Sequence, residues 1–301
     1  MLYRTNENQC WSKYNIDTVI ELENIGDYVQ FQNTSERLGK FSENGCKRVQ
    51  FVMSGRIDAS GNIQSLLNYR KDCPNWSFIY LFKNCESLIS TPEMPATKLG
   101  DYCYDEMYSG CSNLKYASKL PASEIPGAAY QAMFKDCINL LKVPKTPKIT
   151  KIAGSGMHSM FWGCKTIEYG IDIDAYRAEG YCCTYMYHSC IKLNKMPKLN
   201  STILDGYCFM QMFQNCINLK EAELLNATTL GKKCCENMFN GCSSLKSVKV
   251  NFTDWQWENE NYATNYWLYN ISKTGTFTKP SGLPEEYGVS YIPSGWIVEN
   301  I

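Results

Sequence analysis

The sequence is poor in several features on which large classes of function depend. Its 30 basic and 30 acidic residues cancel, so charge does not favour nucleic acid or an anionic membrane as a partner. It has only two histidines, no Cys-x-x-Cys or His-x-x-x-His pair, and no glycine-rich phosphate loop. No apolar run approaches the roughly 18 residues that a transmembrane helix needs. We therefore expect no nucleic-acid partner, no membrane insertion, no metal and no cofactor.

Arrangements for catalysis are equally scarce. A nucleophilic thiol needs a base beside it, but His188 lies two residues before Cys190 and would point to a different face of a helix. Two adjacent carboxylates, Glu285 and Glu286, follow Pro284 and indicate a turn. We expect that the protein is not an enzyme.

The first residues, Met1–Gln9, lack the apolar core of a secretory signal peptide. Either the chain was trimmed, or it does not cross a membrane by the general secretory route. A virion protein that assembles in the cytoplasm would need no such signal.

One motif, in contrast, recurs seven times. It consists of a large apolar residue, an aromatic residue, two polar or small residues, Cys, and then Leu or Ile three residues later. The steps between the repeat cysteines are 26, 26, 27, 26, 26 and 26 residues. A fixed period in this range is typical of leucine-rich-repeat-like solenoids. The repeat cysteines are Cys85, Cys111, Cys137, Cys164, Cys190, Cys216 and Cys242.

The other columns of the repeat suggest its secondary structure. Cys103, Met107 and Cys111 are spaced i, i+4 and i+8, which places them on one face of a short helix. The residues after each repeat Leu or Ile read as a very short parallel strand, which Pro92 or Pro144 would end because proline cannot donate to a ladder. The single inserted residue, between Leu140 and Ile152, predicts a local bulge.

These features predict an α/β repeat solenoid with short parallel strands, short helices and a cap at each end. We expect three parts: a β-rich N-terminal cap or docking module at residues 1–50, the solenoid at 51–250, and an aromatic C-terminal cap at 251–301. The run Val29–Gln32 alternates as a strand does. The C-terminal aromatic residues could cover the exposed core of the last repeat, or serve instead as a platform on which a ligand stacks. These residues are Trp255, Trp257, Tyr262, Tyr266 and Trp267.

Sixteen cysteines suggest a disulfide framework or, alternatively, a set of buried thiols. Most of them fall in columns that the repeat places inside, where free Cys behaves as a small hydrophobe. Cys103 and Cys111 would be about 12 Å apart along a helix, too far for a bridge. We expect buried thiols.

Two outward columns of the strands form the candidate binding site. In the middle repeats the first column alternates tyrosine with lysine, and the second adds three lysines. Tyrosine offers a rigid face and a hydroxyl, and lysine pairs with anionic or polar groups, so the mixture suits a glycan or an acidic protein. The alternative is an ordinary solvated sheet face. The candidate binding residues are Tyr116, Lys119, Lys142, Lys145, Tyr169, Lys195 and Lys198.

The segment Met107–Leu114, which reads Met-Tyr-Ser-Gly-Cys-Ser-Asn-Leu, has Tyr102–Tyr104 before it and Leu120–Ala122 after it. This pattern resembles the BspA-like leucine-rich repeats, and the resemblance covers about residues 50 to 300. Such repeats are found in bacterial surface proteins, many from gut bacteria, and in proteins of their phages. The resemblance carries no catalytic motif and implies recognition or adhesion on an exposed surface.

We therefore expect a non-enzymatic adhesion module, a surface-exposed phage virion component such as a fibre or appendage. It would contact a bacterial or host surface through a surface glycan or a protein ligand. One alternative is a bacterial cell-surface adhesin whose signal is missing from this chain. Another is a purely structural virion subunit that packs against other virion proteins. The sequence also leaves a homo-oligomer open.

Overall fold

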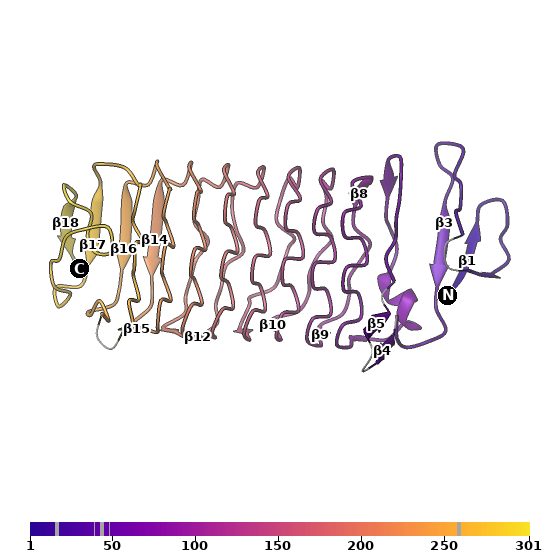
Figure 1. Ribbon diagram of the computed structural model, residues 1–301, viewed down its shortest axis with the longest axis horizontal. Helices are drawn as coiled ribbons and strands as arrows, with labels where there is room; N and C mark the ends of the chain where they lie inside the picture. The colour runs from indigo at the N-terminus through magenta and orange to yellow at the C-terminus, as the bar shows by residue number, and fades with distance from the viewer. Residues whose placement is uncertain (16–17, 39, 43–44, 48, 258–259) are drawn as a thin grey trace.

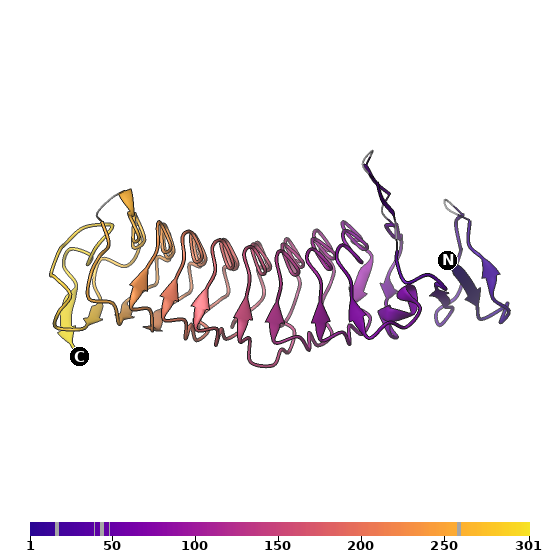
Figure 2. The same ribbon diagram turned by 90° about the horizontal axis from the view of Figure 1, so that it is seen from below.

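The computed structural model describes residues 1–15, 18–38, 40–42, 45–47, 49–257 and 260–301, and the side chains of all of these except 40–47. The chain forms a row of turns that stack side by side along the longest axis, from the N-terminal strands to the C-terminal strands (Figure 1). Seen from below, the arrows of the strands lie along one side of the stack, and tightly wound segments lie along the other (Figure 2). The fold is a leucine-rich-repeat-like solenoid, as the 26-residue period predicts.

Two ladders of short parallel strands run along the stack. The first ladder contains a five-stranded sheet of β10 (Glu124–Ile125), β11 (Lys151–Ile152), β12 (Arg177–Ala178), β13 (Ile203–Leu204) and β15 (Thr229–Leu230). Before it, β7 (Asp72–Cys73) pairs with β9 (Lys98–Leu99). Ile125 pairs with Ile152 across the inserted residue, so the ladder keeps its register there.

The second ladder follows the repeat Leu or Ile, where the sequence predicts the strands. It begins with β6 (Ile57–Asp58) and β8 (Leu88–Ser90) and ends with β14 (Glu221–Leu225), β16 (Ser247–Val250), β17 (Thr276–Lys279) and β18 (Ile297–Asn300). In the middle turns it is reduced to single bridges, such as those from Ser90 to Tyr116 and from Tyr169 to Lys195.

The expected short helices are replaced by a ladder of tight turns. Apart from a single 3₁₀ residue at Glu260, the helical element among the described residues is the 3₁₀ helix η1 (Ile63–Leu67). In every repeat, three residues spaced four apart have positive φ, as at Tyr102 (55°), Glu106 (47°) and Gly110 (76°). A right-handed helix cannot continue through such residues, because it needs a negative φ. Each left-handed position also costs a non-glycine residue about 1–2 kcal/mol.

Hydrogen bonds between neighbouring turns offset this cost. The Tyr104 N–H donates to the Ala129 carbonyl of the next turn (3.0 Å), while the Met107 N–H closes a local turn on the Tyr104 carbonyl (3.2 Å). A four-residue turn period and a 3.6-residue helix both place i, i+4 and i+8 on one face. The inward assignment of Cys103, Met107 and Cys111 is therefore confirmed, although the backbone between them differs.

The core is a stack of identical layers. From Phe82 to Phe239, consecutive rings of the aromatic column lie 5.5–5.7 Å apart and are inclined by 3–12°. Each repeat Cys donates its thiol hydrogen to the backbone carbonyl of the aromatic residue one turn earlier, at 2.8–3.1 Å. Cysteine suits this column because it is small and apolar yet supplies a weak donor.

The prediction of buried thiols is confirmed for the side chains that the structure describes. Fifteen cysteines are free, and all of these except Cys10 are buried; the side chain of Cys46 lies outside the described residues. Burial raises the pKa of Cys85 to about 11 and that of Cys242 to about 12.

One irregular repeat has a packing reason. The hydroxyl of the buried Tyr187 accepts a hydrogen bond from the Ile171 N–H (2.7 Å). A Cβ on the neighbouring Gly170 would lie 2.7 Å from that hydroxyl oxygen, so only glycine leaves room for it. Phe213, in the next turn, has no hydroxyl, and the residue equivalent to Gly170 is the larger Met196.

The N-terminal region forms an antiparallel sheet in the order β2 (Ser12–Lys13), β1 (Leu2–Thr5) and β3 (Val29–Gln32), followed by the hairpin of β4 (Lys40–Ser42) and β5 (Gly45–Lys47). The predicted strand Val29–Gln32 is thus confirmed. Phe31 and Phe51 continue the aromatic column, with ring centroids 5.1 Å apart, and Phe51 stacks on Phe82 at 5.3 Å.

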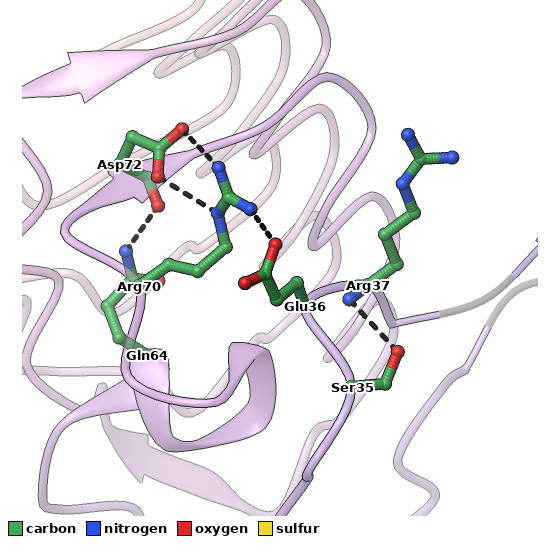
Figure 3. Close-up of polar contacts among 6 residues, drawn as sticks. All are labelled: Ser35, Glu36, Arg37, Gln64, Arg70 and Asp72. Carbon is green, nitrogen blue, oxygen red and sulfur yellow. Dashed lines mark hydrogen bonds and ion pairs between the residues drawn. The ribbon is translucent and has the colours of Figure 1, made fainter.

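A polar cluster also ties this region to the first turns (Figure 3). The Arg70 guanidinium donates to both carboxylate oxygens of Asp72 (2.9 Å each) and pairs with Glu36, which follows β3. The hydrogen bond from Arg70 lowers the pKa of Asp72, and the same bond raises the pKa of Arg70.

Beyond Val250 the chain adds further turns to the stack. The N–H groups of Lys233 and Phe239 donate to the carbonyls of Asn261 (2.8 Å) and Trp267 (2.9 Å), as in the earlier repeats. Trp267 and Trp255 are buried against the end of the core, whereas Tyr262 and Tyr266 are exposed. The aromatic segment therefore contributes both to the core and to the surface. The boundaries at residues 50 and 250 stay predictions.

Candidate binding surface

The seven predicted binding residues, here called the tyrosine–lysine stripe, lie on exposed positions of consecutive turns. Tyr116 is 59 % exposed and Tyr169 is 48 % exposed, although each follows a buried leucine or isoleucine by two residues. Strict strand alternation would put residues two apart on the same face. Here the intervening residues, Lys115 and Glu168, are exposed as well, so the chain departs from alternation after the buried residue and turns the tyrosine outward. The five lysines are exposed as well: Lys119, Lys142, Lys145, Lys195 and Lys198.

Backbone pairing brings members of the stripe next to one another. Tyr169 bridges directly to Lys195 in the following turn. The Leu120 N–H donates to the Lys145 carbonyl (2.9 Å), which places the segment after Lys119 beside Lys145. Adjacent strands lie about 4.8 Å apart, so a ligand that spans several turns could contact several of these side chains at once.

Carboxylates interrupt the positive charge of the stripe. The Lys195 amine lies 3.7 Å from Glu223 Oε1. Asp172 lies beside Lys198, and its Oδ1 accepts a hydrogen bond from the backbone N–H of Lys198 (2.8 Å). Beside the stripe, Lys148 and Asp174 form a looser pair at 3.9 Å. The surface is thus mixed in charge, which suits a partner with hydroxyl groups and scattered acidic groups better than a uniform polyanion.

An aromatic cluster on the tight-turn side was missed by sequence reasoning. The Trp162 ring stacks on Tyr185 at 5.1 Å and lies 4.7 Å from the His188 ring, and the Lys135 amine lies over Trp162 at 4.6 Å. His158 contacts Tyr185 edge-on at 5.7 Å. The cluster joins residues of three turns, so only alignment of the repeats one under another could have revealed it.

The two histidines in this cluster, His158 and His188, are half-buried. Desolvation lowers the pKa of both His158 and His188, and the charge of Lys135 lowers that of His158 further. Neither histidine lies beside an ionised thiol, because burial raises the pKa of Cys164 and Cys190 and keeps both thiols protonated.

A groove of about 540 Å³ lies near the C-terminal end of the tight-turn side. Tyr207, on one side of it, stacks on Tyr181 at 4.8 Å, and Trp257 meets Tyr262 edge-on at 5.2 Å. The Trp257 indole N–H donates to Thr264 (3.2 Å). The groove is lined by Tyr207, Lys232, Lys233, Trp257, Glu260, Tyr262 and Asn265.

Within the described part of the chain, no three His, Cys, Asp or Glu side chains come together as ligands of a metal ion would. No helix among the described residues has the length and apolar character needed to cross a bilayer.

Comparison with known proteins adds two structural likenesses. No protein-family model matches the sequence, and no curated protein matches it. A leucine-rich repeat protein of T. pallidum (TpLRR) aligns over 85 % of this chain and 92 % of its own, with 13 % identity and a TM-score of 0.34. A leucine-rich repeat protein of Bacteroides ovatus aligns over 93 % of this chain and 100 % of its own, with 15 % identity and a TM-score of 0.32.

Proposed function

We propose that the protein is a non-enzymatic recognition module whose tyrosine–lysine stripe binds a surface glycan or an acidic protein. The observation that carries this proposal is the exposure of two tyrosines and five lysines at equivalent positions of consecutive turns. Tyrosine rings pack on the apolar faces of sugars and lose little conformational entropy on binding. Lysine amines donate hydrogen bonds to hydroxyl and carboxylate oxygens.

The protein would be located on the surface of a phage particle. There it would act as a fibre or appendage that contacts a bacterial or host surface. Support comes from the resemblance of Met107–Leu114 and its neighbours to the BspA-like repeats. Capsid and tail genes beside this gene would favour this placement, and an upstream secretion signal would favour a bacterial adhesin. A purely structural subunit would bury the stripe against other virion proteins.

A glycan array with neutral and acidic glycans, probed with the purified chain, tests the binding proposal. Tyr116→Ala/Tyr169→Ala should lose most of the signal, since truncation of a central aromatic contact typically costs about 1–4 kcal/mol of binding. Tyr176→Ala is the matched control, because Tyr176 is 68 % exposed but precedes β12 on the other ladder. Equal loss in both variants, or unchanged binding in the double variant, would contradict the proposal.

A further inference from the structure

A buried lysine stands out at the C-terminal end of the solenoid. Among the charged residues that the structure describes, only Lys279 and Asp105 are buried, and Lys279 is 2 % exposed. Lysine is almost never buried unless its amine is paired. Lys279 is the last residue of β17, next to the final strand β18.

The Lys279 amine lies among three oxygens. It donates to the Leu283 carbonyl (2.8 Å) and to the side-chain amide oxygen of Asn300 (3.1 Å), and it lies 3.9 Å from Glu285 Oε1. The second carboxylate oxygen of Glu285 accepts a hydrogen bond from the Tyr287 hydroxyl (3.2 Å). An amine, a carboxamide and a carboxylate are thus gathered at one point.

Backbone structure holds these groups in place. Lys279 and Asn300 are direct partners in the parallel pair β17–β18, and the Ile301 N–H donates to the Lys279 carbonyl (2.9 Å). The buried Trp255 donates its indole N–H to the Pro284 carbonyl (3.0 Å), which anchors the loop that carries Glu285. Because the fold holds the two reacting groups next to each other, their reaction does not depend on a chance encounter.

We propose that Lys279 and Asn300 form an intramolecular isopeptide bond. Glu285 accepts a proton from the Lys279 ammonium, and the free amine Nζ attacks the carboxamide carbon Cγ of Asn300. Glu285 passes this proton to Nδ2, the Cγ–Nδ2 bond breaks, and Nδ2 leaves as ammonia. Nζ gives its second proton, through Glu285, to the ammonia, which departs as ammonium, and a neutral Nζ–Cγ amide remains. No oxidation occurs and no co-reactant is needed, so the chain loses one molecule of ammonia.

The surroundings suit both steps of the reaction. Lys279 and Leu283 are buried, which limits the water around the attacking amine Nζ. Asn300 is exposed, which gives the departing ammonia a path to solvent. The product would tie β18 covalently to β17, its partner at the edge of the sheet.

Intact mass spectrometry of the full chain, unfolded and reduced, tests the proposal. The wild-type mass should be lower than the sequence mass by one ammonia, and fragment spectra should contain a branched peptide joining Lys279 to Asn300. Asn300→Ala should show the full sequence mass. Asn300→Asp should lose one water instead, because a carboxylic acid forms the same amide with water as the leaving group.

Two further variants test the role of the carboxylate. Glu285→Gln should keep the fold, since the Glu285 side chain is 49 % exposed, but should show little or no mass loss. Glu286→Gln, the adjacent carboxylate, is the control and should react like the wild type. A wild-type chain at its full sequence mass, or an ammonia loss that persists in Asn300→Ala, would overturn the proposed bond. Full conversion in Glu285→Gln would overturn the role of Glu285.

Discussion

The inward and outward columns of the same turns follow opposite rules. Inside, one aromatic ring stacks on the next, and each repeat thiol donates to a carbonyl of the preceding turn. Outside, the column two residues after the repeat Leu or Ile changes from turn to turn, through Ser90, Tyr116, Lys142, Tyr169, Lys195, Glu221 and Ser247. An inward residue must fit its neighbours on both sides, whereas an outward residue meets mainly solvent. Repetition therefore marks packing, and variation marks the surface that is free to acquire a function.

Alkaline pH should lower the stability of the folded protein more than any single substitution, because it acts on many inward thiols at once. The folded pKa of Cys85 is raised to about 11 and that of Cys242 to about 12, above the value of 9.0 for a free thiol. Below pH 9.0 the unfolded and folded states both keep the proton, so the stability is fully present there. As pH rises further the unfolded state loses protons first, and stability falls.

Urea unfolding at about pH 8 and about pH 11 measures this loss directly. We expect a clearly lower midpoint at the higher pH. An unchanged midpoint would mean that the column thiols ionise as readily in the folded protein as in the unfolded chain.

Met133→Ala should be the most damaging of the single substitutions considered. Met133 is fully buried in the inward column, and large-to-small changes at such sites cost about 2–5 kcal/mol. Lys165→Ala, at an exposed position of the next turn, should change stability by less than about 0.5 kcal/mol. Urea unfolding of both variants checks the assignment, and similar losses would contradict it.

Gly170→Ala should cost about 1–3 kcal/mol, because the new methyl group would press on the Tyr187 hydroxyl. Adding Tyr187→Phe removes the closer contact, the hydroxyl oxygen at 2.7 Å, and leaves the ring carbon Cζ at 2.8 Å. Without the hydrogen bond from the Ile171 N–H to the hydroxyl, the ring can shift away from the new methyl group. The double variant should therefore be more stable than the sum of the two single losses predicts. A purely additive result from the four unfolding curves would show that the hydroxyl is not what excludes a side chain at position 170.

Substitutions in the outward columns should affect stability least. Lys119→Ala/Lys145→Ala/Lys198→Ala should shift the free energy of unfolding by less than about 0.5 kcal/mol per site, yet reduce binding on the glycan array. Lys151→Ala, exposed on β11, is the control for general loss of charge. A triple variant that is clearly less stable but binds the array as strongly as the wild type would contradict this and show that the lysines serve the structure.

The spacing of residues predicts the period, the inward columns and the burial of the thiols, because each depends only on which residues recur. It could not predict the tight turns in place of helices, since both backbones put Cys103, Met107 and Cys111 on one face. The contact of Lys279 with Asn300 was also out of reach, because these two residues are 21 apart in the chain, outside the 26-residue period.

The assignment of inward columns is tested most directly by alkylation of the native protein, read out peptide by peptide in a mass spectrometer. Cys10 is exposed and serves as an internal standard that should react at once. The repeat cysteines from Cys85 to Cys242 should remain unmodified until the protein is unfolded, because they are buried and their raised pKa keeps them as thiols. Labelling of these cysteines in the folded protein at the rate of Cys10 would contradict the proposed stacking of the turns.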